Sequence, residues 1–266
     1  MRVRPAFGLL TAVTVALAVS GCETPAPSEP GDPSATPTSS ASSASAADPA
    51  AAQALGQATA ALGNTSFKIT MTSGPSFKLT GQMDAPGGKG SAELTATGTN
   101  TEFHVLTRLA GQDLYVQVPG VTKGTTWTRI DMTRLPEGNT LGLKPGQIDP
   151  ANAAQLLSST TDVRQVDPRK FEGSLDLTKA VGLAGVDQKS IQTYGATAQK
   201  VPFTAGLDEQ GRLSALTIQL PAVQGKQAQP LEVLYTDYGV TVPDVRPAPA
   251  EVVEAPNDLY STLGGK

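Results

Sequence analysis

The sequence is poor in the residues from which catalytic and metal centres are usually built. It contains one cysteine, Cys22, and one histidine, His104, in 266 residues. A histidine with no second histidine, usable cysteine or nucleophile to pair with does not make a catalytic or metal constellation. No G-x-S-x-G nucleophile elbow, P-loop or dinucleotide-binding glycine pattern occurs. We therefore expect a protein that is not an enzyme, with no catalytic residue, no metal site and no cofactor. His104 is predicted to lie on the polar face of a strand.

Long apolar runs and a strong net charge are missing as well. The apolar stretch 6–19 follows Arg2 and Arg4 and falls short of the roughly 20 residues that a membrane-spanning helix needs. A basic start, a short apolar region and small residues before a cut site predict a secretory signal peptide over residues 1–21. Without Arg2 and Arg4 the chain keeps 18 Lys and Arg against 24 Asp and Glu. A formal charge of about −6 opposes binding to nucleic acid and electrostatic docking on anionic lipid.

The lone cysteine stands at the expected cut site. Val19-Ser20-Gly21-Cys22 resembles the lipobox of bacterial lipoproteins, which implies that the thiol takes a diacylglyceryl group and that Cys22 becomes the new N-terminus. An ordinary secretory signal is the alternative, and it would leave an exported free thiol unexplained. Two acyl chains at about 0.8 kcal/mol per buried CH₂ would hold the protein stably on the membrane. We therefore predict a lipid anchor at Cys22 and a place on the extracytoplasmic face of the cell membrane.

Residues 22–47 continue from this anchor as a tract that consists almost entirely of Ser, Ala, Pro, Thr and Gly. The tract has no aromatic and no large aliphatic residue. Such a composition cannot bury enough apolar area to offset its ordering entropy, so we expect a disordered tether. We interpret the tether as a spacer, and O-glycosylation is the alternative use of such a tract.

The folded part begins with a helix and continues with strands. Asp48-Pro49 has the pattern of a helix start, and Leu55, Ala58 and Leu62 share one face before Gly63-Asn64 ends the helix. From residue 67 the apolar period becomes alternating, with turn residues between the runs. This pattern predicts strands over 67–71, 77–83, 92–96, 103–105, 114–118 and 127–132.

The second half repeats these signals. Asp149-Pro150 has the same helix-start pattern ahead of a short helix that ends near Ser158. Further predicted elements are strands at 162–166 and 170–176, a helical segment at 177–183, a hairpin of 200–207 with 213–220, and a last strand at 231–238. From Pro243 onward, prolines at 243, 247, 249 and 256 are expected to break any regular element.

Three features of these elements could be mistaken for sites. Asp208-Glu209 is interpreted as a turn pair and not as a catalytic dyad. Trp127, the only tryptophan, is predicted to pack in the core or at its rim rather than to line a ligand pocket. Tyr235 and Tyr238 lie three positions apart, so on a regular strand they would face opposite sides and form no stacking platform.

The element count predicts an α+β fold with about ten strands and about three short helices. Three short helices cannot cover the apolar face of ten strands. The sheet must therefore fold into a sandwich or curl into a closed or half-open barrel whose concave face is partly vacant. A vacant concave face would make an apolar pocket, and the alternation alone does not decide between these architectures.

The chain also resembles a known family. The resemblance lies in three segments, which are Phe171-Glu172-Gly173, Leu207 to Leu213, and Tyr235-Thr236-Asp237-Tyr238-Gly239-Val240. Over most of residues 49–250 the chain is similar to the mycobacterial LppX/LprG/LprA/LprF lipoproteins. The resemblance implies a fold like that of the lipoprotein carrier LolA, with a single strongly curved antiparallel sheet as a half-open barrel and helices on its concave side. It also implies an acylated lipid or lipoglycan ligand. The family has no short ligand signature, so no ligand-binding residue is assigned. We place this domain at 48–250 and a C-terminal tail at 251–266.

Two functions of different classes follow from these features. The first is a non-enzymatic, membrane-anchored lipoprotein that binds or carries a lipid or lipoglycan in an apolar cavity at the cell envelope. The second is an envelope interaction or sensor lipoprotein with a packed interior that binds a protein partner. A cavity below about 300 Å³ would favour the second, because typical ligand pockets are larger. A hydrolase using His104 is a third and weaker reading.

Overall fold

The structure is a computed structural model that describes residues 48–98, 101–119, 126–135, 148–160, 162–179, 188–222 and 228–263. The predicted signal peptide, the anchor at Cys22 and the tether lie outside the described residues. The described part belongs to one compact unit, Ala44–Lys266.

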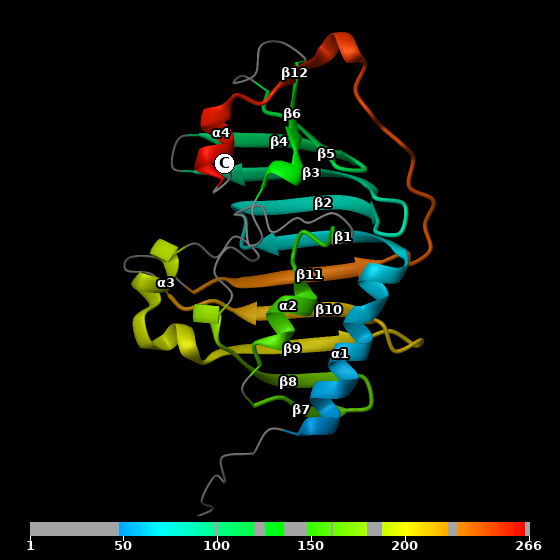
Figure 1. The fold of residues 1–266 in the computed structure, drawn as a ribbon. Helices are drawn as coiled ribbons and strands as arrows, with labels where there is room; N and C mark the ends of the chain where they lie inside the picture. The colour runs from blue at the N-terminus through cyan, green and yellow to red at the C-terminus, as the bar shows by residue number, and fades with distance from the viewer. Residues whose placement is uncertain are drawn as a thin grey trace, which may run out of the picture. The chain divides into compact units, whose positions relative to one another are not determined.

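One sheet of 12 strands dominates the described residues (Figure 1). Its order is β12-β6-β5-β4-β3-β2-β1-β11-β10-β9-β8-β7. The strands are β1 (Ser66–Ser73), β2 (Phe77–Asp84), β3 (Lys89–Thr97), β4 (Glu102–Ala110), β5 (Asp113–Gln117), β6 (Trp127–Asp131), β7 (Arg164–Asp167), β8 (Lys170–Leu175), β9 (Val201–Leu207), β10 (Leu213–Gln219), β11 (Pro230–Thr236) and β12 (Val252–Glu254). All neighbours pair antiparallel except β12, which runs parallel to β6. β12 and β7 are the two edges, so the sheet is not closed.

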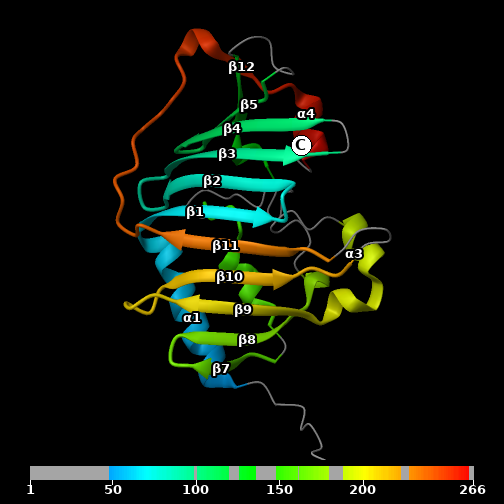
Figure 2. The same cartoon turned by 180° about the vertical axis from the view of Figure 1, so that it is seen from behind.

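Four α-helices and four 3₁₀ turns join these strands within the described ranges. They are α1 (Pro49–Asn64), α2 (Ala153–Ser158), α3 (Gln188–Tyr194) and α4 (Asn257–Thr262), with η1 (Met132–Arg134), η2 (Leu177–Lys179), η3 (Gly195–Gln199) and η4 (Pro249–Glu251). Helices α1 and α2 lie on one face of the sheet, over the half from β7 to β11 (Figures 1 and 2). We call this face the inner face.

The first helix and the alternating strands form as the sequence predicts. The Asp48 carboxylate accepts hydrogen bonds from the Ala50 and Ala51 amides, and Pro49 occupies the first turn. Leu55 and Leu62 are buried on the face that meets the sheet. The hairpin of β9 and β10 turns at Asp208, whose carboxylate accepts from the backbone amides of Gln210 and Arg212, so the turn interpretation is confirmed.

Several predicted details are wrong. The sheet has 12 strands where about ten were expected, it is not purely antiparallel, and four α-helices stand where about three were expected. Helix α2 begins three residues after Pro150, because Asn152 adopts a left-handed conformation at the N-cap and Asp149 turns inward. Of the predicted helical segment 177–183, residues 177–179 form the 3₁₀ turn η2 and residues 180–183 lie outside the described residues.

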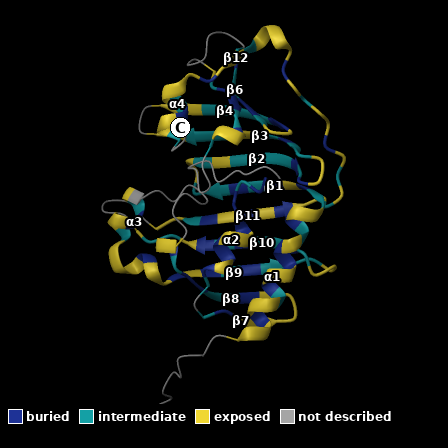
Figure 3. Cartoon of the chain, in the orientation of Figure 1, coloured by how far each residue is buried: buried dark blue, intermediate teal, exposed yellow. Residues whose placement is uncertain are grey.

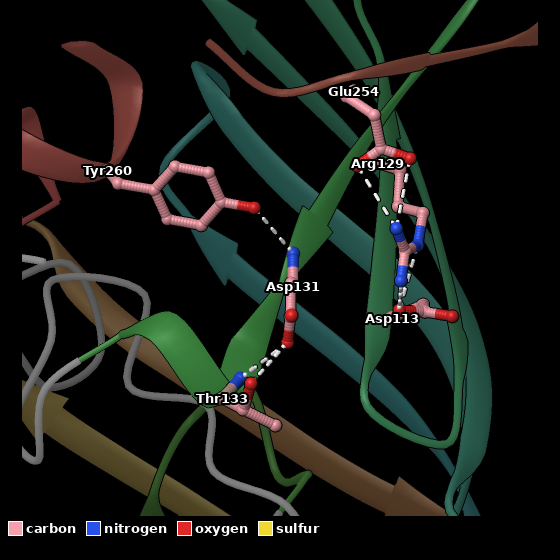
Figure 4. Close-up of polar contacts among 6 residues, drawn as sticks. All are labelled: Asp113, Arg129, Asp131, Thr133, Glu254 and Tyr260. Carbon is pink, nitrogen blue, oxygen red and sulfur yellow. Dashed lines mark hydrogen bonds and ion pairs between the residues drawn. The ribbon is translucent and has the colours of Figure 1, made fainter. Parts of the chain in front are cut away.

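The C-terminal segment is the main correction. Residues 251–263 were expected to be a tail without regular elements, but they contain β12 and α4. The Asp131 amide donates to the Tyr260 hydroxyl at 2.8 Å, and Arg129 pairs with both Asp113 and Glu254 (Figure 4). The regular elements form because the prolines stand at their boundaries, with Pro249 at the start of η4 and Pro256 just before α4.

Tyr235 and Tyr238 require a second correction. Strand β11 ends at Thr236, and Asp237 turns the chain with a positive φ of 49°. Both Tyr235 and Tyr238 therefore contact Phe67, at ring-centroid distances of 5.5 and 6.1 Å. The prediction of opposite faces was wrong because it assumed that the strand continues through residue 238.

Candidate functional site

The inner face has a hollow where no helix of the described residues covers it. Strands β9, β10 and β11 bury every second residue against α1 and α2. The same alternate positions of β2, β3 and β4 are mostly half-buried, as the teal colour of these strands shows (Figure 3). The apolar face thus continues across the sheet beyond the helices.

Small residues at the centre of β2 and β3 deepen the hollow. Gly81 pairs with Ala92, and Gly90 pairs with Met83 in the next inward-facing row. A Cβ on Gly90 would lie 2.6 Å from the Met83 sulfur and 3.0 Å from the Gln82 carbonyl oxygen, so the strands leave no room there for a side chain. Since residues directly opposite each other share a face, Gly81, Gly90 and Ala92 all stand on the inner face and present little or no side chain there.

An apolar cavity of about 540 Å³ occupies this hollow. One wall comes from the inner faces of β1 to β5, with Met71, Phe77, Leu79, Met83, Leu94, Val105, Leu109, Leu114 and Val116. The other wall comes from the segment before α2 and the chain around β10 and β11, with Ile148, Pro150, Leu220 and Leu231.

The buried carboxylate of Asp149 holds the second wall in place. Asp149, between the wall residues Ile148 and Pro150, accepts hydrogen bonds from the Ala151 amide at 3.0 Å and the Ala153 amide at 2.8 Å. The Tyr235 hydroxyl on β11 donates to both of its oxygens at 3.0 Å. The carboxylate therefore ties the segment to the sheet and binds the amides at the start of α2.

Burial has the largest effect on the pKa of the Asp149 carboxyl. It raises the pKa of the Asp149 carboxyl, and the hydrogen bonds from Ala153, Ala151 and Tyr235 counteract part of that rise. The pKa of the Tyr235 hydroxyl is raised well above its ordinary value by burial and by the neighbouring Asp149 charge. Tyr235 thus stays a hydrogen-bond donor across the ordinary pH range.

The lining of the cavity can exclude water but offers little for acid–base chemistry. None of the described lining residues is charged. The hydroxyl of Thr107 donates to the Ala92 carbonyl oxygen at 3.2 Å and is therefore satisfied within the sheet. Such a cavity favours alkyl groups through the hydrophobic effect, at about 25 cal/mol per Å² of apolar area removed from water.

The structure places His104 and Trp127 away from the cavity. Cys22 lies outside the described residues, and no ligand-binding residue was predicted. His104 lies on the outer face of β4, where its Nε2 atom is 2.7 Å from Glu93, which confirms its place on the polar side. Trp127 is buried in a small outer cluster under the Arg108 guanidinium, at 4.3 Å from the ring centroid, so the packing prediction is confirmed.

The described residues offer neither a metal site nor a membrane-spanning helix. No group of three or more His, Cys, Asp or Glu side chains in these ranges could hold a metal ion. Of the helices that the structure describes, none has both the length and the apolar character required to cross a membrane.

Most of the cavity residues lie on strands that the sequence predicts, but no local pattern marks them as a site. The available signal is the pair of small residues on an otherwise apolar face of β3, Gly90 and Ala92. Comparison with known proteins adds no assignment, because no protein-family model and no curated protein matches the chain. The resemblance to the LppX/LprG lipoproteins therefore stays a prediction.

Proposed function

We propose that the protein is a membrane-anchored lipoprotein that binds or carries an acylated lipid at the extracytoplasmic face of the cell membrane and that it is not an enzyme. The observation that carries this proposal is the apolar cavity of about 540 Å³ on the inner face of the sheet, whose described lining residues are all uncharged. Acyl chains are the ligand chemistry that these residues recognise, because they offer apolar contact and no charged partner.

The size of the cavity favours this function over a packed interaction scaffold. Ligand pockets in proteins have volumes of about 300–1,000 Å³, and the cavity falls within this range. An envelope interaction protein with a filled interior would have a space below about 300 Å³. A lipid ligand therefore agrees better with the observed volume.

The architecture supports the finer fold assignment that the resemblance implies. The sheet is unclosed, and α1 and α2 cover only part of its inner face. We infer a LolA-like, half-open barrel with a strongly curved sheet from this combination. In such a fold the cavity is the space that the helices leave between themselves and the sheet.

Lipidation of Cys22 is the second part of the proposal. The lipobox-like run before Cys22 and the Ser/Pro-rich tract after it supply an anchor and a spacer. An anchored binding domain would meet lipids that leave the outer face of the same membrane. Binding and presentation of such lipids need no bond to form or break.

The proposal is tested by filling the cavity. The chain from residue 22 to residue 266, carrying Cys22→Ala so that no anchor is present, contains the whole described domain. This chain is incubated with vesicles of bacterial envelope lipid, separated from them, and assayed for bound lipid by extraction and mass spectrometry. The Ala92→Phe variant places a ring in the cavity, whereas Thr95→Phe places the same ring on the opposite face of the same strand.

We expect the parent chain and Thr95→Phe to carry lipid, and Ala92→Phe to lose at least about nine-tenths of it. Thermal melting of all three chains shows whether the variants are folded. Equal lipid in Ala92→Phe and the parent chain, or no lipid in any of them, would contradict the proposed function.

A further inference from the structure

The inner face of β4 passes from buried to exposed along its length. Leu109 is 5% exposed, Val105 is half-buried and lines the cavity, and Phe103 is 50% exposed. These three residues lie on one face because side chains two positions apart on a strand point the same way. The apolar face of β4 therefore leads from the cavity to solvent at the Phe103 end.

The neighbouring strands have the same gradient. At one end of β4, Leu109 pairs with Gly90 on β3 and with Leu114 on β5, and Leu114 pairs in turn with Ile130 on β6. The side chains of Leu109, Leu114 and Ile130 are all buried. At the other end Phe103 pairs with Ala96, and Ala96 pairs with the cavity residue Phe77. Phe77 and Ala96 are only half-buried. Leu109 and Leu114 thus line the buried end of the cavity, and the row Phe77–Ala96–Phe103, of which Phe77 lines the cavity, is the exposed end of the same apolar face.

The volume limits how much alkyl chain can enter. An apolar cavity of about 150 Å³ holds one benzene ring, so about 540 Å³ corresponds to roughly 20 carbon atoms. That is the size of one long acyl chain. Two such chains would need about twice the space, and close-packed walls resist expansion on that scale.

The absence of charge from the described lining decides where a headgroup lies. A phosphate or carboxylate inside would lose its hydration without gaining a charged partner from those residues. The polar end of the ligand must therefore stay at the row Phe77–Ala96–Phe103, in contact with water. Exposed Phe103 then covers the part of the chain nearest the headgroup.

We infer that the cavity takes a single acyl chain, which enters past Phe77, Ala96 and Phe103, and that the ligand is a single-chain amphiphile whose polar end stays outside. This inference rests on the lipid-binding function proposed above and narrows it to one substrate class. A fatty acid and a monoacyl glycerophospholipid share this chemistry.

The test compares ligands that differ only in chain number. Palmitoyl lysophosphatidylglycerol and dipalmitoyl phosphatidylglycerol have the same headgroup and the same chain length, and palmitate serves as the free fatty acid. Each is titrated against residues 22–266 carrying Cys22→Ala, and native mass spectrometry counts the bound molecules. Ala96→Trp narrows the entrance, and Thr95→Trp is the matched control on the outer face of β3.

We expect one molecule of lysolipid or of palmitate per protein molecule. Whichever of the two binds more tightly identifies the class of lipid that supplies the acyl chain. The diacyl lipid should bind at least about tenfold more weakly than the lysolipid, because its second acyl chain finds no space in the cavity. Two methylene groups of that chain left in water already correspond to about a tenfold change in affinity. Ala96→Trp should weaken lysolipid binding at least about tenfold, and Thr95→Trp should leave it within about twofold.

Different failures are separable. Equal affinity for the diacyl lipid, or two lysolipids per chain, would overturn the single-chain inference while lipid binding stands. Unchanged lysolipid binding in a folded Ala96→Trp chain would overturn the entrance. If none of the three ligands binds, the proposed function itself fails, and the inference fails with it.

Discussion

Replacement of Tyr260 by alanine should destabilise the whole domain, although the residue lies seven positions from the end of the chain. Its side chain is 1% exposed and belongs to the main hydrophobic core. Its hydroxyl accepts from the Asp131 amide at 2.8 Å, and the Arg134 guanidinium carbon lies 3.7 Å from its ring centroid. The side chain therefore joins α4 to β6 by a hydrogen bond and to η1 by a cation–π contact, and its ring packs in the core.

The magnitude follows from these contacts. Truncation of a buried aromatic side chain to alanine costs about 3–5 kcal/mol. Removal of the hydroxyl alone in Tyr260→Phe should cost about 1 kcal/mol, since the ring packing remains. In a domain of this size 1 kcal/mol corresponds to roughly 2–4 °C in Tm, so Tyr260→Ala should lower Tm by roughly 10 °C.

The assay is thermal and urea-induced unfolding followed by circular dichroism. Ser261→Ala, on the exposed side of the same helix, is the control and should change stability by less than about 0.5 kcal/mol. If Tyr260→Ala unfolds like the parent chain, α4 does not contribute to the domain, and the reasoning that joins it to β6 is refuted.

Two further predictions concern the anchor and the buried carboxylate. Cys22→Ala should release the protein from membranes or leave the uncleaved precursor, with Tm unchanged; sedimentation with membranes after signal removal, or a Tm several degrees lower, would refute the anchor or the tether. Burial raises the folded-state pKa of Asp149, so its contribution to stability is fully present below the unfolded pKa of about 3.8 and is lost as pH rises through the folded value. As the pH rises from 4 to 7, the free energy of unfolding of the parent chain should therefore fall relative to that of Asp149→Asn. If the free energies of the two chains change in parallel with pH, the pKa of Asp149 is not raised.

The local part of the fold could be predicted from the sequence because local patterns determine it. Asp48 and Pro49 signalled the start of α1, and the alternation in 67–71 and 77–83 gave the strands β1 and β2 with the correct faces. The hairpin of β9 and β10 was predictable because its turn residues lie between two apolar runs.

The long-range part could not be predicted in the same way. Strand β12 has three residues and pairs parallel to β6, some 125 positions earlier, so no local period signals it. The cavity depends on how far α1 and α2 extend over the sheet, which is a property of tertiary packing. Gly90 and Ala92 indicate a cavity only once the register of β2 and β3 is known.

Whether the cavity holds a lipid can be decided by comparing two masses of the same protein. The full chain is purified from the envelope in which it is made, and its mass is measured under native and under denaturing conditions. We expect a native mass that exceeds the denatured mass by one single-chain lipid, with no such difference for Ala92→Phe. Equal native and denatured masses for the parent chain, with the cavity confirmed to be empty by failure to bind added lysolipid, would contradict the proposed function.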